Sequence, residues 1–193
     1  MAAIATSSDG PADDPPLSAT SDELLLARFN RGDRAALGQL ASRYERPLLG
    51  LTLGIVGGRR DQALDAVQDT WVRVIRFAKG FKEGSTVKTW LYRVAINAAK
   101  DARSRASRMR LQTGEPSELA DVSEPVSELG RTVRDTVNSL SEDRRLLVLL
   151  CYHQELTHVQ VAEVLGVPAG TVKSRLHAAL IELREKLGQE VAP

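Results

Sequence analysis

The stretch LTHVQVAEVLGVPAGTVKSRL, residues 156–176, decides the fold of the second half of this chain. Thr157 and Gln160 have the spacing of a capping box, and Gly166 is a typical end for the helix that they start. Pro168 then suits the first turn of a second helix. Two short helices joined by a glycine turn predict a helix-turn-helix. The apolar residues expected to pack its helices together are Val161, Ala162, Leu165, Val172 and Leu176.

This packing leaves four polar side chains of the second helix free, and they are Lys173, Ser174, Arg175 and His177. Side chains near the start of a recognition helix reach base edges and phosphates in the major groove of DNA. We therefore expect Gly166 and Pro168 to orient this helix so that its polar side chains face duplex DNA. Helical hairpins with glycine turns also occur in proteins that never bind DNA, so the hairpin alone leaves that alternative open.

The rest of the chain has the same helical period. Apolar residues recur at spacings of three and four at Leu37, Leu40, Tyr44, Leu48, Leu51 and Ile55, with Pro47 as a kink or restart point. A helix over 61–79 is expected to bury Leu64, Val67, Trp71, Val74 and Ala78, and another follows over 86–105. In the second half, Val126, Leu129, Val133, Val137 and Leu140 form one amphipathic stripe. No stretch alternates like a strand, so the fold class is all-α.

Helix starts and composition divide this helical chain. Thr20 with Glu23 has capping-box spacing, while Asp33 and Ser141 are expected to cap later helices. Residues 1–20 are rich in Pro, Ser and Asp and predict a disordered tail, and residues 113–125 predict a flexible acidic linker. The prediction is two small helical domains, 21–112 and 126–188, with a short tail over 189–193.

Charge is distributed unevenly between these segments. Residues 21–112 contain eighteen Lys or Arg against nine acids, which gives +9, although the whole chain carries only +1. A basic first domain predicts that a polyanion meets this domain most strongly. Scattered solvated arginines are the alternative.

Several classes of protein are disfavoured. The chain has no apolar run long enough for a bilayer span and no basic, then apolar, leader at its start, so we expect a cytoplasmic protein without membrane insertion. It has no phosphate-binding glycine loop and no catalytic triad motif, so we expect no enzyme activity, no cofactor and no small-molecule substrate. A zinc site is not expected at Cys151, His153 and His158, because no second pair of ligands follows them. We expect Cys151 to be a small buried apolar residue.

In both of its halves, the chain resembles the extracytoplasmic-function (ECF) group of bacterial RNA polymerase sigma factors. Three motifs carry the resemblance, in the order and spacing of that family. They are DAVQDTWVRV at 65–74, TWLYRVAINAAKD at 89–101, and the helix-turn-helix stretch at 156–176. The resemblance implies three partners, which are core RNA polymerase, promoter DNA and an anti-sigma factor.

The first motif lies on the helix over 61–79, whose outward side carries a mixed acidic and polar stripe. In the family, the helix with the QD pair docks on the largest polymerase subunit. The resemblance therefore implies that Asp65, Gln68, Asp69, Val72, Arg73 and Arg76 bind core polymerase. The alternative is an ordinary solvated helix face.

The second motif resembles the part of the family that captures an unstacked base of the minus-ten element. Such capture needs an aromatic pocket, polar groups that read the base, and cations along the strand. The resemblance assigns this work to Phe81, Lys82, Lys88, Trp90, Tyr92, Arg93, Asn97, Lys100 and Arg103, with Arg105 as a further phosphate contact. Trp90 fits core packing equally well, so Asn97 is the stronger candidate for base reading.

The third motif resembles the family region that binds the minus-thirty-five element, and it adds Thr171 to the four side chains named above. One departure is that Ala178 stands where relatives often carry arginine, which predicts weak or unusual binding upstream. By resemblance, the acidic linker threads the polymerase cleft as a nucleic-acid mimic.

Two other functions remain open at the level of sequence. The chain could be an ordinary helix-turn-helix regulator whose first domain senses a ligand or dimerises, binding duplex DNA without melting it. It could also be a sigma-like decoy that binds polymerase or a regulator and has lost promoter binding.

Overall fold

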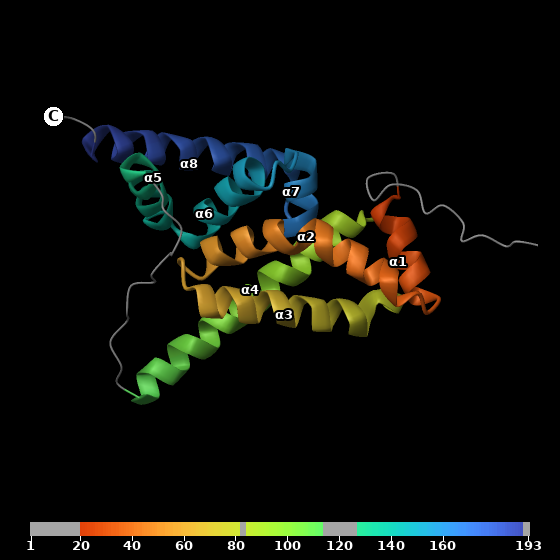
Figure 1. Cartoon of the computed structure of the whole chain (residues 1–193). Coiled ribbons are helices and arrows are strands. Elements are labelled where there is room, and N and C mark those ends of the chain that lie inside the picture. Colours follow the sequence, from red (N-terminus) through yellow and green to blue (C-terminus); the bar gives the residue numbers. More distant parts are fainter. Residues whose placement is uncertain (1–19, 82–83, 114–126, 191–193) are drawn as a thin grey trace, which may run out of the picture.

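The computed structural model describes residues 20–81, 84–113 and 127–190. Within these ranges it contains eight α-helices and no strand, which confirms the all-α prediction (Figure 1). The first half contains α1 (Asp22–Asn30), α2 (Arg34–Ile55), α3 (Arg60–Phe77) and α4 (Val87–Thr113), with a 3-10 turn at Ala78–Gly80. The second half contains α5 (Glu128–Asn138), α6 (Glu142–Val148), a π-helical turn η2 (Leu149–His153), α7 (His158–Leu165) and α8 (Ala169–Glu190).

The first half is built around α2. Its predicted apolar stripe is confirmed, since Leu40, Leu48 and Leu51 are fully or almost fully buried. The helices α3 and α4 pack against each other and against α2, while α1 covers one end (Figure 1). A residue of α1 also fixes the start of α4, because the carboxylate of Glu23 accepts a hydrogen bond from the backbone N–H of Val87 at 3.2 Å.

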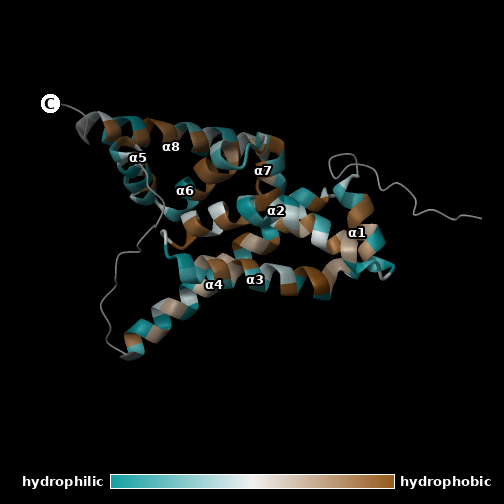
Figure 2. Ribbon diagram, viewed as in Figure 1, coloured by the Kyte–Doolittle hydropathy of each residue, from teal (hydrophilic) through white to brown (hydrophobic). Residues whose placement is uncertain are grey.

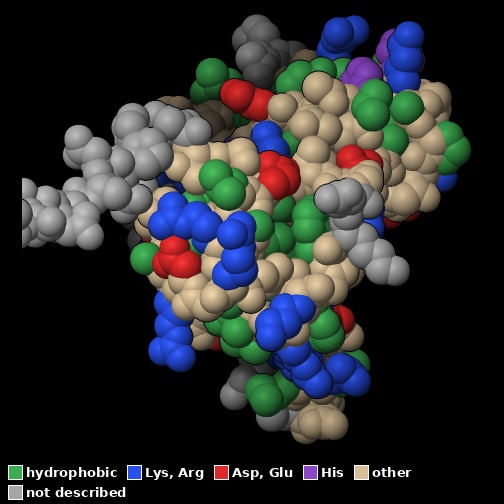
Figure 3. Space-filling model, turned by 90° about the vertical axis from the view of Figure 1, so that its right-hand side faces the viewer, with side chains coloured by type: hydrophobic (Ala, Val, Ile, Leu, Met, Phe, Trp, Pro, Cys, Tyr) green, Lys and Arg blue, Asp and Glu red, His purple; other side chains and the backbone are tan. Residues whose placement is uncertain are grey.

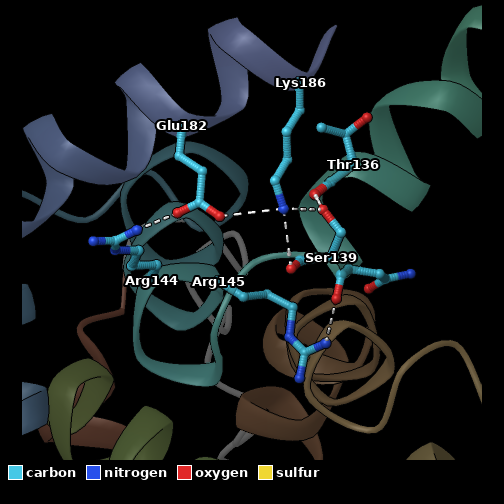
Figure 4. A network of polar contacts seen from close by, with 7 residues as sticks. Thr136, Ser139, Arg144, Arg145, Glu182 and Lys186 are labelled. Atoms are coloured by element: carbon cyan, nitrogen blue, oxygen red, sulfur yellow. Dashed lines mark hydrogen bonds and ion pairs between the residues drawn. The ribbon is translucent and has the colours of Figure 1, made fainter. Parts of the chain in front are cut away.

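In the second half, the long helix α8 packs against α5, α6 and α7 (Figure 1). A polar network ties α8 to the turn between α5 and α6 (Figure 4). Glu182 of α8 pairs with Arg144 of α6 and with Lys186, whose Nζ lies 3.2 Å from the carboxylate. Lys186 Nζ also donates to Ser139 Oγ at 2.9 Å. Figure 2 shows how apolar residues concentrate between the helices and polar ones outside.

The helix-turn-helix has the predicted local geometry. The Thr157 side chain accepts from Gln160 N at 3.3 Å, and the Gln160 side chain accepts from Thr157 N at 2.9 Å, which completes the capping box. Gly166 ends α7 with φ 67°, a left-handed conformation that glycine adopts at little cost. The second helix begins at Ala169, directly after Pro168.

Four local features differ from the expectation. The cap of α1 is Ser21, whose side chain accepts from Leu24 N at 3.2 Å, and Thr20 is instead buried. Pro47 does not restart the helix, because α2 runs unbroken through it. The helix α4 continues to Thr113, well past the expected end at 105 and into the first residue of the predicted linker. Ser141 stands at the start of α6 but makes no side-chain capping bond.

Two predicted core stripes are partly wrong. Leu64 of α3 is 42% exposed, and Leu129 and Val133 of α5 are 66% and 41% exposed. Val67 and Val74 of α3 are buried as predicted, and the other buried positions of this helix are occupied by the small residues Ala63, Ala66 and Thr70. The predicted N-terminal tail, apart from Thr20, and the residues of the linker after Thr113 lie outside the described residues, as do Val126 and the end of the C-terminal tail.

Replacing Leu48 with alanine is expected to lower the free energy of unfolding by about 2–5 kcal/mol, because Leu48 is 0% exposed and truncation leaves a cavity. Urea unfolding followed by circular dichroism measures the loss. Leu24→Ala is the control, since Leu24 is 48% exposed and its truncation leaves no cavity. Equal stability of the two variants would contradict this assignment of the core.

Candidate polymerase and nucleic-acid interfaces

One side of α3 is exposed along its whole length, and we call it the outer α3 face. It consists of Leu64, Asp65, Gln68, Val72, Ile75 and Arg76. Val72 and Ile75 are 61% and 54% exposed, so the face combines apolar and polar side chains. The predicted outward stripe is thus present in the structure. An exposed face of this mixed kind is typical of a surface that binds another protein.

Asp69 and Arg73 lie at the edge of this face and are bound within the chain. The Arg73 guanidinium donates to Asp69 at 2.8 Å and to Asp101 of α4 at 2.7 Å. The bond to Asp101, with a smaller contribution from Asp69, raises the pKa of Arg73 above its usual range. These two residues therefore link α3 to α4, whereas Asp65, Gln68 and Val72 are free to face a partner.

A second row, exposed except for the half-buried Trp90 and Lys100, runs along α4, and we call it the α4 stripe. Its members follow each other at spacings of three and four residues as far as Ser107, and Arg108 follows directly; they are Trp90, Arg93, Asn97, Lys100, Ser104, Ser107 and Arg108. From Trp90 to Arg108 the stripe is roughly 27 Å long at the rise of an α-helix. Asn97 is exposed near its middle. A row of polar and cationic groups of this length suits a nucleic-acid strand.

At one end of the α4 stripe, two aromatic rings pack together. The centroids of Phe81 and Trp90 are 5.4 Å apart with planes tilted by 56°. Both rings are only partly buried, so Trp90 packs on the core and still keeps an exposed surface. Phe81 also lines a shallow cleft with Glu23, Asn30 and Ser85. Lys82, the other predicted residue of this loop, lies outside the described residues.

At the other end of the α4 stripe, cations gather in a cleft between the start of α3 and the C-terminal part of α4. Its lining consists of Arg59, Lys100, Arg103, Ser104, Ser107, Arg108 and Arg110, and we call it the arginine cleft. Burial lowers the pKa of Arg59, and the nearby charges of Arg110 and Arg103 lower it further, with Asp61 opposing them. In Figure 3, Lys and Arg side chains gather at the lower end of the molecule, where α4 projects in Figure 1.

Four of the predicted minus-ten residues touch the second half of the chain. Tyr92 is 2% exposed, and its hydroxyl donates to Gln154 Oε1 at 2.7 Å. Burial raises the pKa of Tyr92 to about 12, so the hydroxyl remains a neutral donor. Arg93 donates to the backbone carbonyl of Glu163, and Lys100 and Arg103 pair with Glu142. By contrast, Asn97 is exposed and Lys88 is half-buried.

The recognition helix α8 presents the predicted side chains outward. Lys173, Ser174, Arg175 and His177 are exposed and Thr171 is half-buried, while Val172 and Leu176 are 0% and 4% exposed against α7. His and Lys or Arg side chains lie together at the top of Figure 3, where α8 begins in Figure 1. Ala178 is half-buried, so this position takes part in helix packing as well.

Cys151 is half-buried rather than fully buried, and burial raises the pKa of its thiol. Across residues 20–81, 84–113 and 127–190 the structure brings together no group of three or more His, Cys, Asp or Glu that could hold a metal ion. No helix in these same ranges is long and apolar enough to cross a membrane.

Sequence reasoning missed two parts of these surfaces. Leu64 and Ile75 complete the outer α3 face, and a helical wheel centred on Val72 would have shown both beside it. Arg59, Arg108 and Arg110 complete the arginine cleft. The basic end of α4 signalled charge there, but nothing in the sequence placed Arg59, which lies some fifty residues earlier, beside it.

Comparisons with known proteins identify the family to which this chain belongs. Residues 40–109 match the family "Sigma-70 region 2" and residues 130–183 match "Sigma-70, region 4". The chain is 32% identical over 188 residues to the ECF RNA polymerase sigma-E factor of Haemophilus influenzae, covering 90% of this chain and 96% of that protein. It is also 32% identical over 192 residues to the RNA polymerase sigma-H factor of Pseudomonas aeruginosa, covering 92% and 97%.

Solved structures agree with this relationship. CnrH in complex with the cytosolic domain of CnrY is similar in fold, with a TM-score of 0.68, 24% identity, and coverage of 88% of this chain and 99% of CnrH. The sigma factor RpoE in complex with the anti-sigma factor NepR from Bartonella quintana gives a TM-score of 0.66 and 25% identity, covering 81% and 98%. The chain belongs to the sigma-70 family, within its extracytoplasmic-function group, and is an ECF-type RNA polymerase sigma factor.

Proposed function

We propose that this sigma factor binds core RNA polymerase through the outer α3 face. The exposed side chains of Val72 and Ile75 supply apolar surface that is removed from water on binding. Asp65, Gln68 and Arg76 supply polar contacts around this apolar surface. Asp69 and Arg73 contribute at the edge, where their ion pairs hold α3 against α4. The domain that performs this work comprises residues 21–112.

The α4 stripe and its two ends form the minus-ten surface in this proposal. The Phe81–Trp90 pair offers an aromatic platform at one end, and the arginine cleft offers phosphate-binding cations at the other. Asn97, exposed between them, has an amide that can donate to and accept from the edge of an unstacked base. Lys88 lies close to the platform in sequence and is free to approach a phosphate.

The single observation that carries the proposal is the placement of Asn97 between these two ends on one helix face. An ordinary helix-turn-helix regulator has no need for a second DNA surface on a separate domain. The second domain, residues 126–188, binds the minus-thirty-five element through Lys173, Ser174, Arg175 and His177, with Thr171 at the start of the helix. We place the protein in the cytoplasm, where polymerase and promoter DNA meet.

Replacing Asn97 with alanine is expected to reduce promoter melting by about tenfold, because one lost base contact removes roughly 1–3 kcal/mol. Closed-complex formation is expected to change little, since the phosphate contacts remain. Permanganate reactivity of unpaired thymines in the polymerase complex measures melting. Asn138→Ala in α5, a half-buried asparagine outside the α4 stripe, is the matched control, and equal reactivity of the Asn97 variant and wild type would overturn the assignment.

An anti-sigma factor is proposed as a further partner. The solved relative RpoE was crystallised with the anti-sigma factor NepR, and RpoE shares fold and 25% identity with this chain. The exposed apolar residues Leu129 and Val133 of α5 offer a surface for such a protein. Capture of a partner by the wild-type chain, and its loss on Val133→Asp, tests this part of the proposal.

A further inference from the structure

The arginine cleft has five cations, and no acid, among the described residues that line it. Arg59 comes from the start of α3, and Lys100, Arg103, Arg108 and Arg110 come from α4. The cations therefore approach the cleft from two walls rather than along one helix. The volume of the cleft, about 450 Å³, lies in the usual range for small-molecule sites, which is roughly 300–1,000 Å³.

Only part of this positive charge is neutralised within the chain. The carboxylate of Glu142 pairs with two of the cations, Lys100 and Arg103. Across residues 20–81, 84–113 and 127–190, no carboxylate forms an ion pair with the other three. Three guanidinium groups thus line a concave site without a counter-ion.

The crowding of these cations is visible in the pKa of Arg59. Burial lowers this pKa, and the charges of Arg110, Arg103 and Arg145 lower it further, while Asp61 opposes them. A lowered pKa means that the charged form of Arg59 is less stable in the cleft than in water. An anion between the guanidinium groups would reverse this effect, because it would place opposite charge among groups that now repel each other.

The side chains of the cleft are suited to phosphate oxygens. The Nε of Arg59 donates to the side-chain oxygen of Gln62 at 2.9 Å, which orients the guanidinium and uses only one of its five N–H donors. Ser104 and Ser107, one turn apart on α4, line the same cleft and supply hydroxyl donors. Forked guanidinium groups together with hydroxyl groups are typical donors to a phosphate.

The number of donors indicates more than one phosphate group. Each guanidinium can bind phosphate oxygens through two parallel hydrogen bonds, so the four arginines bring about eight such donors, more than one phosphate accepts in this way. The charge agrees, because five cations less the one charge of Glu142 leave a charge of four. A phosphate group carries about 1.5–2 negative charges near neutral pH, so two adjoining phosphates match the cleft.

The arrangement of the cations favours a compact anion over an extended strand. A strand that follows the α4 stripe needs cations spread along the helix axis. In the cleft, Arg103, Arg108 and Arg110 lie within about 10 Å of helix, and Arg59 adds its charge from α3. The positive charge is therefore gathered around one place, where a small ligand can contact all of it.

We propose that the arginine cleft is a binding site for a small soluble ligand with a diphosphate group, such as a nucleoside polyphosphate. The diphosphate lies between Arg59 and the arginines of α4, and it ties the start of α3 to the projecting end of α4. This ligand goes beyond the proposed function, in which the cleft binds DNA phosphates. Its effect on DNA rests on that function, because a ligand in the cleft excludes the strand from these cations.

Isothermal titration calorimetry of the full chain with pyrophosphate tests the site. We expect one pyrophosphate per chain, bound at least about tenfold more tightly than inorganic phosphate at the same ionic strength. Arg59→Gln is expected to weaken pyrophosphate binding by about tenfold to a hundredfold, because one charge-assisted contact is lost. Arg60→Gln is the matched control, since Arg60 is the next residue, is exposed and does not line the cleft.

Three results overturn the proposal. They are undetectable binding of pyrophosphate to the wild-type chain, binding no tighter than that of inorganic phosphate, and equal weakening by Arg59→Gln and Arg60→Gln. Arg110→Gln provides a second test on the other wall of the cleft, with Arg105→Gln as its control because Arg105 is exposed and does not line the cleft. Thermal unfolding followed by circular dichroism checks that each variant is folded.

The effect on DNA is measured separately, in the complex with core polymerase. The fraction of a labelled promoter fragment that is bound is compared with and without pyrophosphate at ten times its Kd, with sodium sulfate matching the ionic strength. We expect pyrophosphate to weaken promoter binding by up to about tenfold with the wild-type chain, and by much less with Arg59→Gln. Equal losses in both complexes overturn the competition with DNA. Calorimetry uses neither DNA nor polymerase, so failure of the ligand site is distinguishable from failure of the proposed function.

Discussion

Replacing Val72 with aspartate is expected to weaken binding to core polymerase by about a hundredfold, or roughly 2.7 kcal/mol. Val72 is 61% exposed at the centre of the outer α3 face, between Gln68 and Ile75. In the complex, the new carboxylate would be taken out of water without a partner, which is costly. In the free chain it stays hydrated, so the fold is expected to remain intact. Fluorescence titration of labelled protein with core polymerase measures the affinity.

Val72 is a sharper choice than Asp69 for this experiment. The carboxylate of Asp69 is bound to Arg73, which also binds Asp101, so removing Asp69 disturbs the link between α3 and α4. Leu24→Asp is the matched control, because Leu24 is a 48% exposed apolar residue of α1 that lies outside the outer α3 face. Equal affinities of the Val72 and Leu24 variants for core polymerase would contradict the assignment.

Replacing Arg175 with glutamate is expected to reduce use of the minus-thirty-five element by about tenfold to a hundredfold. Arg175 is exposed on α8 beside Lys173 and His177, and reversal of its charge exchanges a phosphate or base contact for repulsion. Initiation should then lose much of its dependence on upstream sequence. The measurement compares initiation from one promoter, recovered from a library, with and without its upstream element.

The same helix offers the control. Arg184 is exposed nine residues after Arg175, which places it on the opposite side of α8. Arg184→Glu changes net charge equally and is expected to leave upstream recognition unchanged. If both variants lose activity alike, or neither does, α8 does not read the upstream element through the proposed side.

Local structure was predictable where one short stretch contains all the groups involved. The capping box of Thr157 and Gln160 and the turn at Gly166 need only neighbouring residues, and the structure has both. The exposed positions of the recognition helix follow from the same period. The outward side of α3 could also be predicted, because polar residues at three- and four-residue spacings mark it.

The errors came from packing between distant segments. Leu64 was expected in the core because apolar size usually predicts burial, but α3 and α4 approach each other through small residues. Ala63 and Ala66 of α3 and Ala98 of α4 are all 0% exposed, and this close approach leaves Leu64 outside. The close packing of Gly50 and Gly54 of α2 against His153 and Leu149 could not be predicted either, because these partners lie about a hundred residues later in the chain.

In the proposed function, this chain gives core polymerase its promoter specificity. The most direct measurement is transcription from a library of promoter templates, with core polymerase and this protein as the only specificity subunit. We predict discrete start sites that share sequence near minus ten and minus thirty-five, and that vanish with the Val72→Asp variant. Unchanged, unselective transcription by core polymerase in the presence of the wild-type chain would show that the chain is not a specificity subunit.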